Sequence, residues 1–447
     1  VFSNLLINQF LIEGVNYVKN KKAQLETQLK ITNNPFSLTI KLGKLRLEKM
    51  NFNINGFYSK GGKDLVDLNL KGNKIEISEI FSVLPNVKLD LSTNYSSRGI
   101  LNFNGNLKGV LNNNKKLSFL VDFNTENAFL KSPKTNLQFE QINLKGNFKS
   151  QSQILNINQF STIIDSQLIS GSVKISNFKN PKYLINVNGK VDLEKIPNLL
   201  KVDSLNLNGI AEFNLNSNLE TIDDSLIIKK LAGSLNSQNM FIDMPNYEIQ
   251  LQNILINFPK DQMKINVEKG VLNNDTFSIS ANWEKWKEVV FSSKKNIYIN
   301  YSAKIQQFYL DHFLNSISSE ESSEYKYSLN GSISAKKIFY EDLIFENILI
   351  DKILYNENIF IKDLTASGFG GEINCNLVTI EFENKKSNMK INGEIKDLNI
   401  PKTMLVFNDF DQDLILNEHV TGSVSSKFNL NLIIDEKGEI DFINSTI

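Results

Sequence analysis

Apolar residues alternate with polar ones over most of the chain. Near the C-terminus, Val420, Val424, Phe428, Leu430 and Leu432 fall at even spacing, with Ser, Lys and Asn between most of them. Because successive side chains of a β-strand point to opposite faces, this spacing predicts a strand with one apolar and one polar face. Similar segments recur roughly every ten residues between Gly, Asn, Asp or Ser turns, which favours an antiparallel meander.

One pattern, a strand followed by a short amphipathic helix and a second strand, occurs four times. The first strand of each copy carries Gly72, Gly189, Ala303 or Gly393 at an equivalent place, and the differences between these numbers are 117, 114 and 90 residues. Such spacings exceed the usual solenoid periods, so each copy is predicted to contain several strands. The chain is thus predicted to be one elongated repetitive β body, a segment of a longer protein, over residues 1–447 with approximate repeats 35–182, 183–296, 297–387 and 388–447, the last of them truncated.

Helical periodicity is limited to one or two turns in each copy. Apolar residues three and four positions apart occur in four short segments, 78–84, 194–200, 310–317 and 401–407. Pro197 and Pro401 stand where a first helical turn tolerates proline. Residues 1–34 begin with an apolar run that is compatible with a strand or with a short helix.

The apolar face of the predicted sheet cannot remain in water over several strands, since its exposure costs about 25 cal/mol per Å². A second sheet packed on it, closure into a barrel, or a curled sheet that holds a hydrophobic ligand would each satisfy it. Four copies in line favour an elongated body. The predicted fold class is therefore all-β, mainly antiparallel, with short helices.

Composition excludes some classes of protein. The chain has 49 Lys and Arg against 49 Asp and Glu, so no net field favours nucleic acid. Cys375 is the single cysteine, which excludes an internal disulfide. No stretch reaches the roughly 18 consecutive apolar residues of a membrane-spanning helix. The first residues lack the features of a signal peptide, and we interpret the sequence as a segment whose anchor or export signal lies outside it.

No arrangement of residues predicts catalysis or a metal site. His312 and His419 have no potential ligands or catalytic partners at suitable spacing, and Cys375 alternates with apolar residues as a small hydrophobe of the sheet would. Residues 368–372 (GFGGE) lack the Lys-Ser/Thr of a phosphate loop and predict a β-turn. Residues 409–413 (DFDQD) lack the glycine and glutamate of a calcium loop and predict a solvated loop. We expect no cofactor and no enzymatic activity.

Trp283 and Trp286 stand three residues apart in an amphipathic segment with nearby lysines. Indoles favour the boundary between a membrane and water, so the pair is compatible with an interfacial position. We favour the alternative, a helical turn that packs against the edge of the sheet.

One series of motifs resembles the AsmA-like family of bacterial envelope proteins, particularly its C-terminal region in Bacteroidota. The series consists of the FGGEI turn of Phe369–Ile373, a strand ending in NGEI, a short helix and a strand of the pattern (V/L)xGxxxxxFxLxL. The resemblance is clearest from about residue 297 onward. It implies a relative of the bridge-like lipid transfer proteins, in which a curled sheet forms a hydrophobic groove. It also implies a periplasmic chain anchored in the inner membrane by a segment outside this sequence.

The hypothesis drawn from this resemblance is a non-enzymatic module that holds phospholipid acyl chains in an apolar β-groove, for transfer from the inner to the outer membrane or for outer-membrane homeostasis. Its partners would be phospholipids, the inner membrane through that anchor, and outer-membrane components, with no nucleic acid. From the alternation alone, the predicted lining of the lipid groove is Leu101, Phe103, Leu107, Leu205, Leu207, Phe213, Leu215, Leu329, Ile333, Val424, Phe428 and Leu430. The alternative is a structural or adhesive β-sandwich scaffold with no lipid cargo.

Overall fold

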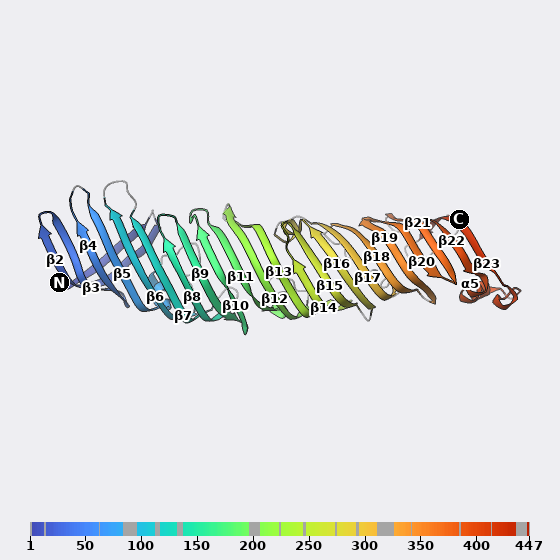
Figure 1. Cartoon of the computed structure of the whole chain (residues 1–447), viewed down its shortest axis with the longest axis horizontal. Coiled ribbons are helices and arrows are strands. Elements are labelled where there is room, and N and C mark those ends of the chain that lie inside the picture. The colour runs from blue at the N-terminus through green and yellow to red at the C-terminus, as the bar shows by residue number, and fades with distance from the viewer. Residues whose placement is uncertain are drawn as a thin grey trace. The chain divides into compact units, whose positions relative to one another are not determined.

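The computed structural model describes residues 2–446 except 13–14, 62, 84–95, 112–116, 132–136, 196–205, 223–224, 245–246, 273–274, 292–294, 311–325, 341, 384–385, 413 and 435–444. All 23 strands of this described part belong to one sheet (Figure 1). The fold is all-β and mainly antiparallel with short helices, which confirms the predicted fold class.

The strands are β1 (Phe2–Ile12), β2 (Val15–Asn33), β3 (Phe36–Leu47), β4 (Met50–Ser59), β5 (Leu65–Glu76), β6 (Ser96–Val110), β7 (Ser118–Lys131), β8 (Gln138–Lys149), β9 (Ile154–Ile164), β10 (Gln167–Ser176), β11 (Lys182–Asp192), β12 (Asn206–Ile222), β13 (Ser225–Met244), β14 (Tyr247–Asn257), β15 (Gln262–Leu272), β16 (Asp275–Glu284), β17 (Asn296–Tyr309), β18 (Lys326–Tyr340), β19 (Leu343–Asn356), β20 (Asn358–Gly368), β21 (Gly371–Glu383), β22 (Lys386–Asn399) and β23 (Ser423–Ile434). The helices are α1 (Ile77–Val83), α3 (Trp286–Phe291) and α5 (Ile400–Val406), with 3-10 turns η1 (Leu193–Lys195), η2 (Asn408–Asp411) and η3 (Asn417–His419).

The chain divides into two compact units, residues 1–191 with 212–231, and residues 192–211 with 232–447. The apolar start of the chain, which the pattern left open, is a strand, because β1 pairs with β2 in the first unit. Neighbouring strands with a defined register pair antiparallel, apart from β17 and β18 in the second unit, which pair in parallel. The 16-residue connection between these two strands fits this geometry, since a parallel pair needs a long crossover.

In the first unit, directly paired residues form an unbroken apolar row across the ten strands β2 to β11. Each member lies opposite the next on the neighbouring strand, and every one is buried or half-buried. The members of this first row are Leu25, Leu45, Phe52, Gly72, Phe103, Phe123, Gly146, Ile157, Val173 and Ile185.

The second unit repeats this arrangement across the ten strands β14 to β23. The members of its row are Ile254, Val267, Ile279, Ala303, Ile333, Ile350, Leu364, Cys375, Gly393 and Phe428. Six of the ten are buried, namely Ile254, Val267, Ala303, Ile350, Cys375 and Gly393. In both units the apolar residues therefore occupy one face of the sheet in register, strand after strand.

Glycines on this face accommodate aromatic rings from the next strand. A Cβ atom added to Gly72 would lie 2.4 Å from Phe103 Cε1, and one added to Gly331 would lie 2.6 Å from the Tyr301 ring. The ring lies across the backbone of its paired glycine, which has no side chain to displace it. Five such directly paired sets are Gly72 with Phe103, Gly146 with Phe123, Gly270 with Phe277, Gly331 with Tyr301 and Gly393 with Phe428.

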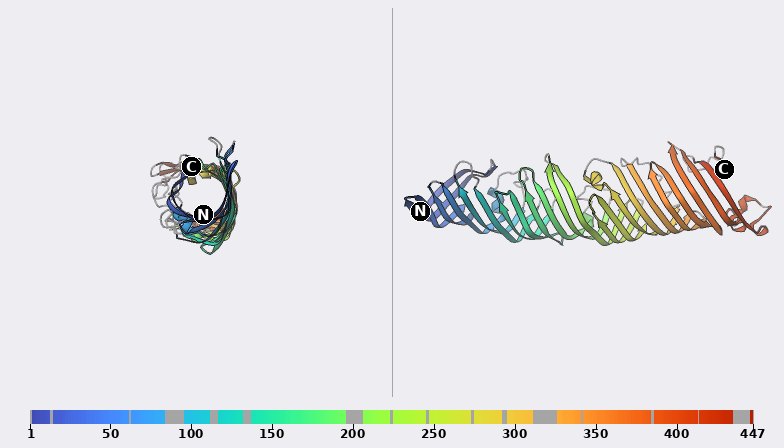
Figure 2. Two further views of the ribbon diagram at one scale, coloured as in Figure 1. Left: turned by 90° about the vertical axis from the view of Figure 1, so that its left-hand side faces the viewer. Right: turned by 45° about the horizontal axis from the view of Figure 1, so that its top comes forward.

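Repeated β-bulges bend the strands. Lys74, Asn127 and Asp397 have φ values of 55°, 50° and 52° and lie at or beside register shifts. At each, a side chain of the neighbouring strand accepts a hydrogen bond from the bulged N–H, as Asn102 does from Lys74 at 2.9 Å. A bulge increases the local right-handed twist, consistent with the curved course of the strands in Figure 2.

Two of the four predicted helical segments lie in the described residues, apart from Leu84, and are helical over most of their length. Segment 78–84 corresponds to α1, whose Ile80 packs on the apolar cluster of Met50, Phe52 and Ile75. Segment 401–407 corresponds to α5, which has Pro401 in its first turn and is capped by the Asn399 side chain, which accepts from the Lys402 N–H at 2.9 Å. Most of 194–200, with Pro197, and of 310–317 lies outside the described residues.

The four anchor residues of the repeats lie in β5, β11, β17 and β22. The first two steps each contain six strands and the last contains five, which accounts for the shorter spacing of 90 residues between Ala303 and Gly393. The repeat boundaries themselves stay a prediction.

We predict that Gly72→Ala destabilises the chain by about 1–3 kcal/mol, because the new methyl group would displace the Phe103 ring. Gly61→Ala is the matched control, since no atom lies within 4 Å of a Cβ at Gly61. It should change the free energy of unfolding by less than about 1 kcal/mol. Urea unfolding followed by circular dichroism measures both, and equal stability of the two variants would contradict the ring-over-glycine packing.

Candidate functional site

The predicted lining residues of the first unit lie on its apolar face. Phe103 belongs to the first row, between Gly72 and Phe123. Leu101 and Leu107 lie two and four residues away on the same face of β6 and are half-buried. The alternation in β6 therefore identified the correct face in this strand.

The predicted lining residues of the second unit likewise share its apolar face. Ile333 and Phe428 belong to the second row, and Leu430 pairs with Ile391 beside it. Leu329 lies between Ile299 and Tyr355. Val424 pairs with Leu398 but is 41% exposed, so it contributes least to this face.

The remaining predicted lining residues come from β12. Leu207, Phe213 and Leu215 are half-buried and alternate with exposed residues such as Asn214. Leu205 lies outside the described residues. These positions thus follow the predicted alternation wherever β12 is described.

Alternation alone did not single out several residues that the pairing places on the same faces. Phe52, Phe123, Phe277 and Tyr301 lie in or beside the two rows and face glycines or apolar residues on adjacent strands. Their own strands carry the alternating signal, but only the register brings them together. An aromatic residue opposite a glycine marks this face, but such a pair can be recognised only when the register of the strands is known.

The apolar faces are not packed like the core of a closed domain. In the described part of the chain, no large side chain is less than 2% exposed. Seven of the ten residues of the first row and four of the ten of the second are half-buried. All described strands belong to one sheet, so no second sheet of described residues covers these faces. A continuous apolar surface in this state is suited to holding apolar ligand.

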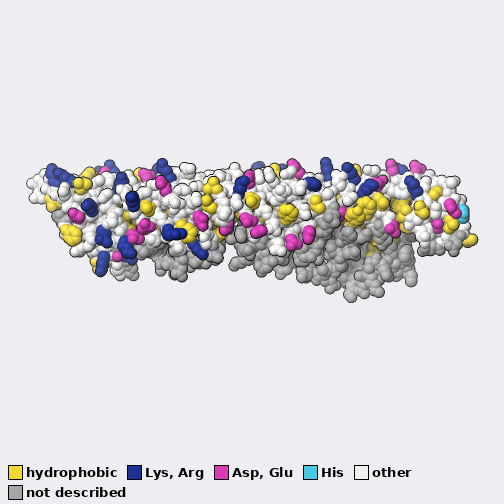
Figure 3. Space-filling model, turned by 90° about the horizontal axis from the view of Figure 1, so that it is seen from below, with side chains coloured by type: hydrophobic (Ala, Val, Ile, Leu, Met, Phe, Trp, Pro, Cys, Tyr) yellow, Lys and Arg dark blue, Asp and Glu magenta, His cyan; other side chains and the backbone are white. Residues whose placement is uncertain are grey.

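The opposite face is polar and laterally hydrogen-bonded. Asn106 donates to Asn69 at 2.8 Å, and Asn69 donates to Asn55 at 3.1 Å, in a ladder across β4 to β6. Asn106 also donates to Asp67, and this bond, with Lys108 at 3.1 Å, lowers the pKa of the Asp67 carboxyl. The surface in Figure 3 correspondingly shows basic, acidic and scattered hydrophobic side chains interspersed over the described residues.

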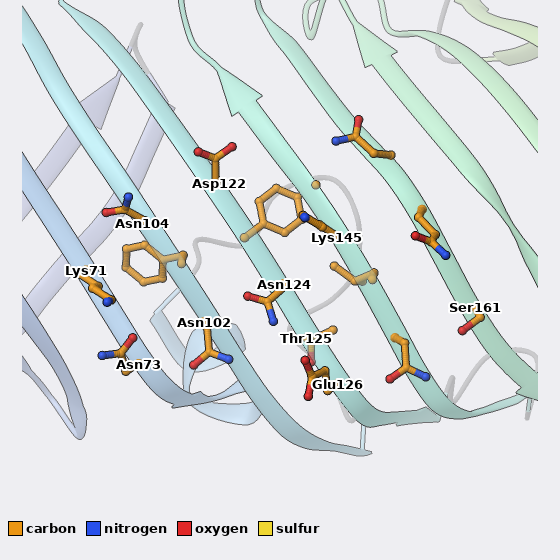
Figure 4. A pocket seen from close by; sticks show the side chains of 17 residues that line it. Lys71, Asn73, Asn102, Asn104, Asp122, Asn124, Thr125, Glu126, Lys145 and Ser161 are labelled. Carbon is orange, nitrogen blue, oxygen red and sulfur yellow. The ribbon is translucent and has the colours of Figure 1, made fainter.

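A shallow depression of about 610 Å³ lies among β5 to β9 of the first unit. Asn102, Asn104, Asp122 and Asn124 line it from two neighbouring strands (Figure 4). Acidic and basic groups are mixed around it, and it contains no histidine or cysteine. This arrangement offers amide hydrogen bonds but neither a nucleophile nor a general base with an orienting partner.

The residues considered for chemistry occupy structural positions. His419 is exposed, and its Nδ1 accepts the Leu416 N–H at 3.1 Å. Residues 368–371 form the predicted turn, with positive φ at Phe369 and Gly370 as in a type I′ hairpin. Asp409 accepts the Asn417 N–H at 2.7 Å. Within the described residues, no three His, Cys, Asp or Glu side chains gather as metal ligands would, and His312 lies outside them.

The two tryptophans do not share a helical turn. Trp283 lies in β16, between Met263 and Ile299 on its neighbours, whereas Trp286 begins α3. Trp286 is 3% exposed and packs on Phe258, with ring centroids 5.3 Å apart. The favoured interpretation, packing on the sheet, therefore holds for Trp286, while a helical turn for Trp283 is wrong because its strand continues to Glu284.

Among the helices in the described residues, none is long and apolar enough to cross a membrane. Comparison with known proteins found no matching family model, no similar curated protein and no similar solved structure. The resemblance to AsmA-like proteins thus stays a prediction from the sequence.

We predict that the Cys375 thiol reacts slowly with iodoacetamide in the folded chain. Cys375 is 8% exposed within the second row, and burial raises its pKa, so less thiolate is present at any given pH. At about pH 8, alkylation should be at least about tenfold slower than in urea-unfolded chain, as followed by mass spectrometry. Equal rates in both states would mean that this part of the apolar face is freely open to small solutes.

Proposed function

We propose that this chain is a lipid-binding and lipid-transport module of a bacterial envelope, not an enzyme. Phospholipid acyl chains would lie along the apolar faces while head groups remain in water. The setting that fits this activity is the periplasm, with transfer between inner and outer membranes. One observation carries the proposal, namely the unbroken apolar row across ten strands in each unit.

The length of the rows matches acyl chains better than a compact ligand. Neighbouring strands lie about 4.8 Å apart, so ten strands provide an apolar path longer than 40 Å, at order of magnitude. Each buried CH₂ group contributes about 0.8 kcal/mol, so an acyl chain can be held without a specific polar contact. The rows consist of aliphatic side chains, aromatic rings and glycines, with Cys375 as a small hydrophobe, and no charged group interrupts them.

The uniformity of the rows favours movement along them. Where an aromatic ring is paired with a glycine, the apolar face combines a large and a small residue, as at Gly72 with Phe103 and at Gly393 with Phe428. Neighbouring positions are therefore similar in shape and hydrophobicity. A ligand held by apolar contact alone would meet sites of similar affinity on successive strands, and it could slide without a strongly bound intermediate.

The alternative, a structural or adhesive scaffold, predicts that the apolar faces are satisfied by the protein itself. The half-buried state of seven of the ten residues in the first row and the single sheet of the described part favour a ligand over such internal closure. An enzyme is the least supported class, because the described polar groups do not combine an acid, a base and a nucleophile.

We predict that Phe103→Asp, Phe213→Asp and Phe428→Asp together abolish lipid loading, since each places a carboxylate on an apolar face. Native mass spectrometry and lipid extraction of the purified chain measure the phospholipid carried. The parent should carry several phospholipids per chain and the triple variant few or none.

The matched control is Asn104→Asp, Asn214→Asp and Asn429→Asp. Each replaced asparagine is the next residue along the same strand, is exposed and faces the polar side, so the control adds the same charge without entering the apolar face. It should carry as much lipid as the parent. Undiminished lipid on the folded phenylalanine variant would overturn the assignment, and a lipid-free parent would favour the scaffold.

A further inference from the structure

A dense exposed hydrophobic patch lies in the second unit beside the start of β23. Six large apolar residues within eleven consecutive positions are exposed: Leu405 at 65%, Val406 at 38%, Phe407 at 44%, Phe410 at 60%, Leu414 at 90% and Ile415 at 55%. This set, called the apolar tip below, belongs to α5 and the turns that follow it (Figure 1). Elsewhere in the described chain, exposed apolar residues are more scattered, and clustering of this kind marks an interaction surface.

The backbone of the apolar tip is hydrogen-bonded by its own side chains. Gln412 Oε1 accepts the N–H groups of Leu414 at 3.2 Å and Ile415 at 2.9 Å, and Gln412 Nε2 donates to the Ile415 carbonyl. The Asp409 carboxylate accepts two hydrogen bonds from Asn417, one from its backbone N–H and one from its side-chain amide. A turn whose polar backbone groups are paired internally can leave water at low cost.

The apolar tip is connected to the apolar interior of the second unit by a series of rings. Phe410 stacks on Phe407 at 5.8 Å between centroids, Phe407 meets Phe369 at 5.8 Å, and Phe369 meets Phe345 at 5.9 Å. Phe345 packs on the buried cluster of Ala335, Ile348, Ile350 and Ala366, and Ile350 is a member of the second row. The exposed patch is thus continuous with the proposed lipid-holding face.

The charge balance of the sequence segment that contains the apolar tip does not favour an electrostatic attraction to anionic lipid. Residues 400–422 contain Asp409, Asp411, Asp413 and Glu418 against the single lysine Lys402. Basic residues near a surface draw a protein to anionic lipid, and this segment has the opposite balance. A lipid surface that accepts it must therefore be entered by burial of apolar side chains.

We propose that the apolar tip inserts into the surface of a zwitterionic phospholipid bilayer and forms the point where acyl chains pass between that bilayer and the apolar face of the second unit. The passage of acyl chains rests on the proposed function, whereas the insertion is a separate property of the tip. Bulky aliphatic residues at the outermost positions, on a turn with an internally paired backbone, fit a bilayer whose acyl region offers no hydrogen bonds.

The test compares the chain with a Leu414→Ser, Ile415→Ser variant in sedimentation with phosphatidylcholine vesicles. The variant keeps the backbone N–H groups that Gln412 accepts, and its partition onto vesicles should fall by at least about tenfold. The control variant, Leu42→Ser with Leu226→Ser, removes two side chains of similar exposure, 71% and 59%, from outside the tip. It should bind vesicles as the parent does.

A second measurement keeps the test independent of the folding of that variant. In Leu414→Trp, the new indole should be quenched by brominated phosphatidylcholine more strongly than Trp283 and Trp286 are in the parent chain. Replacing part of the phosphatidylcholine by phosphatidylglycerol should not strengthen binding. An unquenched indole, or binding that requires phosphatidylglycerol, overturns the insertion.

The outcomes separate this inference from the proposed function. If the parent chain carries lipid but does not bind vesicles, insertion of the apolar tip into a bilayer is wrong, whereas the proposed lipid carriage is supported. A lipid-free parent that binds vesicles through Leu414 and Ile415 supports the tip and overturns lipid carriage. If the double serine variant only converts a dimer of the parent into a monomer in sedimentation velocity, without changing vesicle binding, the tip is a contact between copies of the chain and the proposal is wrong.

Discussion

The fold depends on one constraint, the register that holds apolar residues opposite one another on successive strands. A slip of one residue at any strand would move its apolar side chains to the polar face. In the first unit, the pairing of Phe103 with Phe123 and of Val173 with Ile185 keeps the same face apolar from β2 to β11. The polar ladder of Asn55, Asn69 and Asn106 supports the same register from the other side, since these amides bond laterally only when their strands are aligned.

Glycines and bulges reconcile this strict register with a curved sheet. A row made only of large side chains would crowd as strands twist, and the glycines opposite Phe103, Phe123 and Phe428 relieve that crowding. Bulges at Lys74, Asn127 and Asp397 increase the local twist of their strands. The neighbouring strand bonds each bulged N–H, so the bend leaves no unpaired donor there. Curvature and continuity of the apolar face are therefore properties of the same residues.

Much of this arrangement follows from the sequence. Period-two alternation identified the fold class and the correct faces of β6, β18 and β23, and helical spacing identified α1 and α5. Pairing is not local information, and the sequence therefore did not show that Phe103 meets Gly72 or that Cys375 meets Gly393. Asparagine has a structural use in the bulges, because Asn127 tolerates their left-handed backbone. The spacing of Trp283 and Trp286 indicated one shared helical turn, because a spacing of three residues does not reveal where a strand ends.

A carrier built on an apolar face meets a physical difficulty at its point of exchange. The affinity that would hold an acyl chain along the rows would also oppose its release into water, by about 0.8 kcal/mol for each CH₂ group exposed. Release is feasible when the chain passes directly from one apolar medium to another. The rings of Phe345, Phe369 and Phe407 lead from the interior of the second unit to exposed residues, and an acyl chain in contact with them stays shielded on one side. In the proposed carrier, an apolar tip at that place would lower the barrier to exchange without any change in affinity along the rows, as transport without a catalytic step requires.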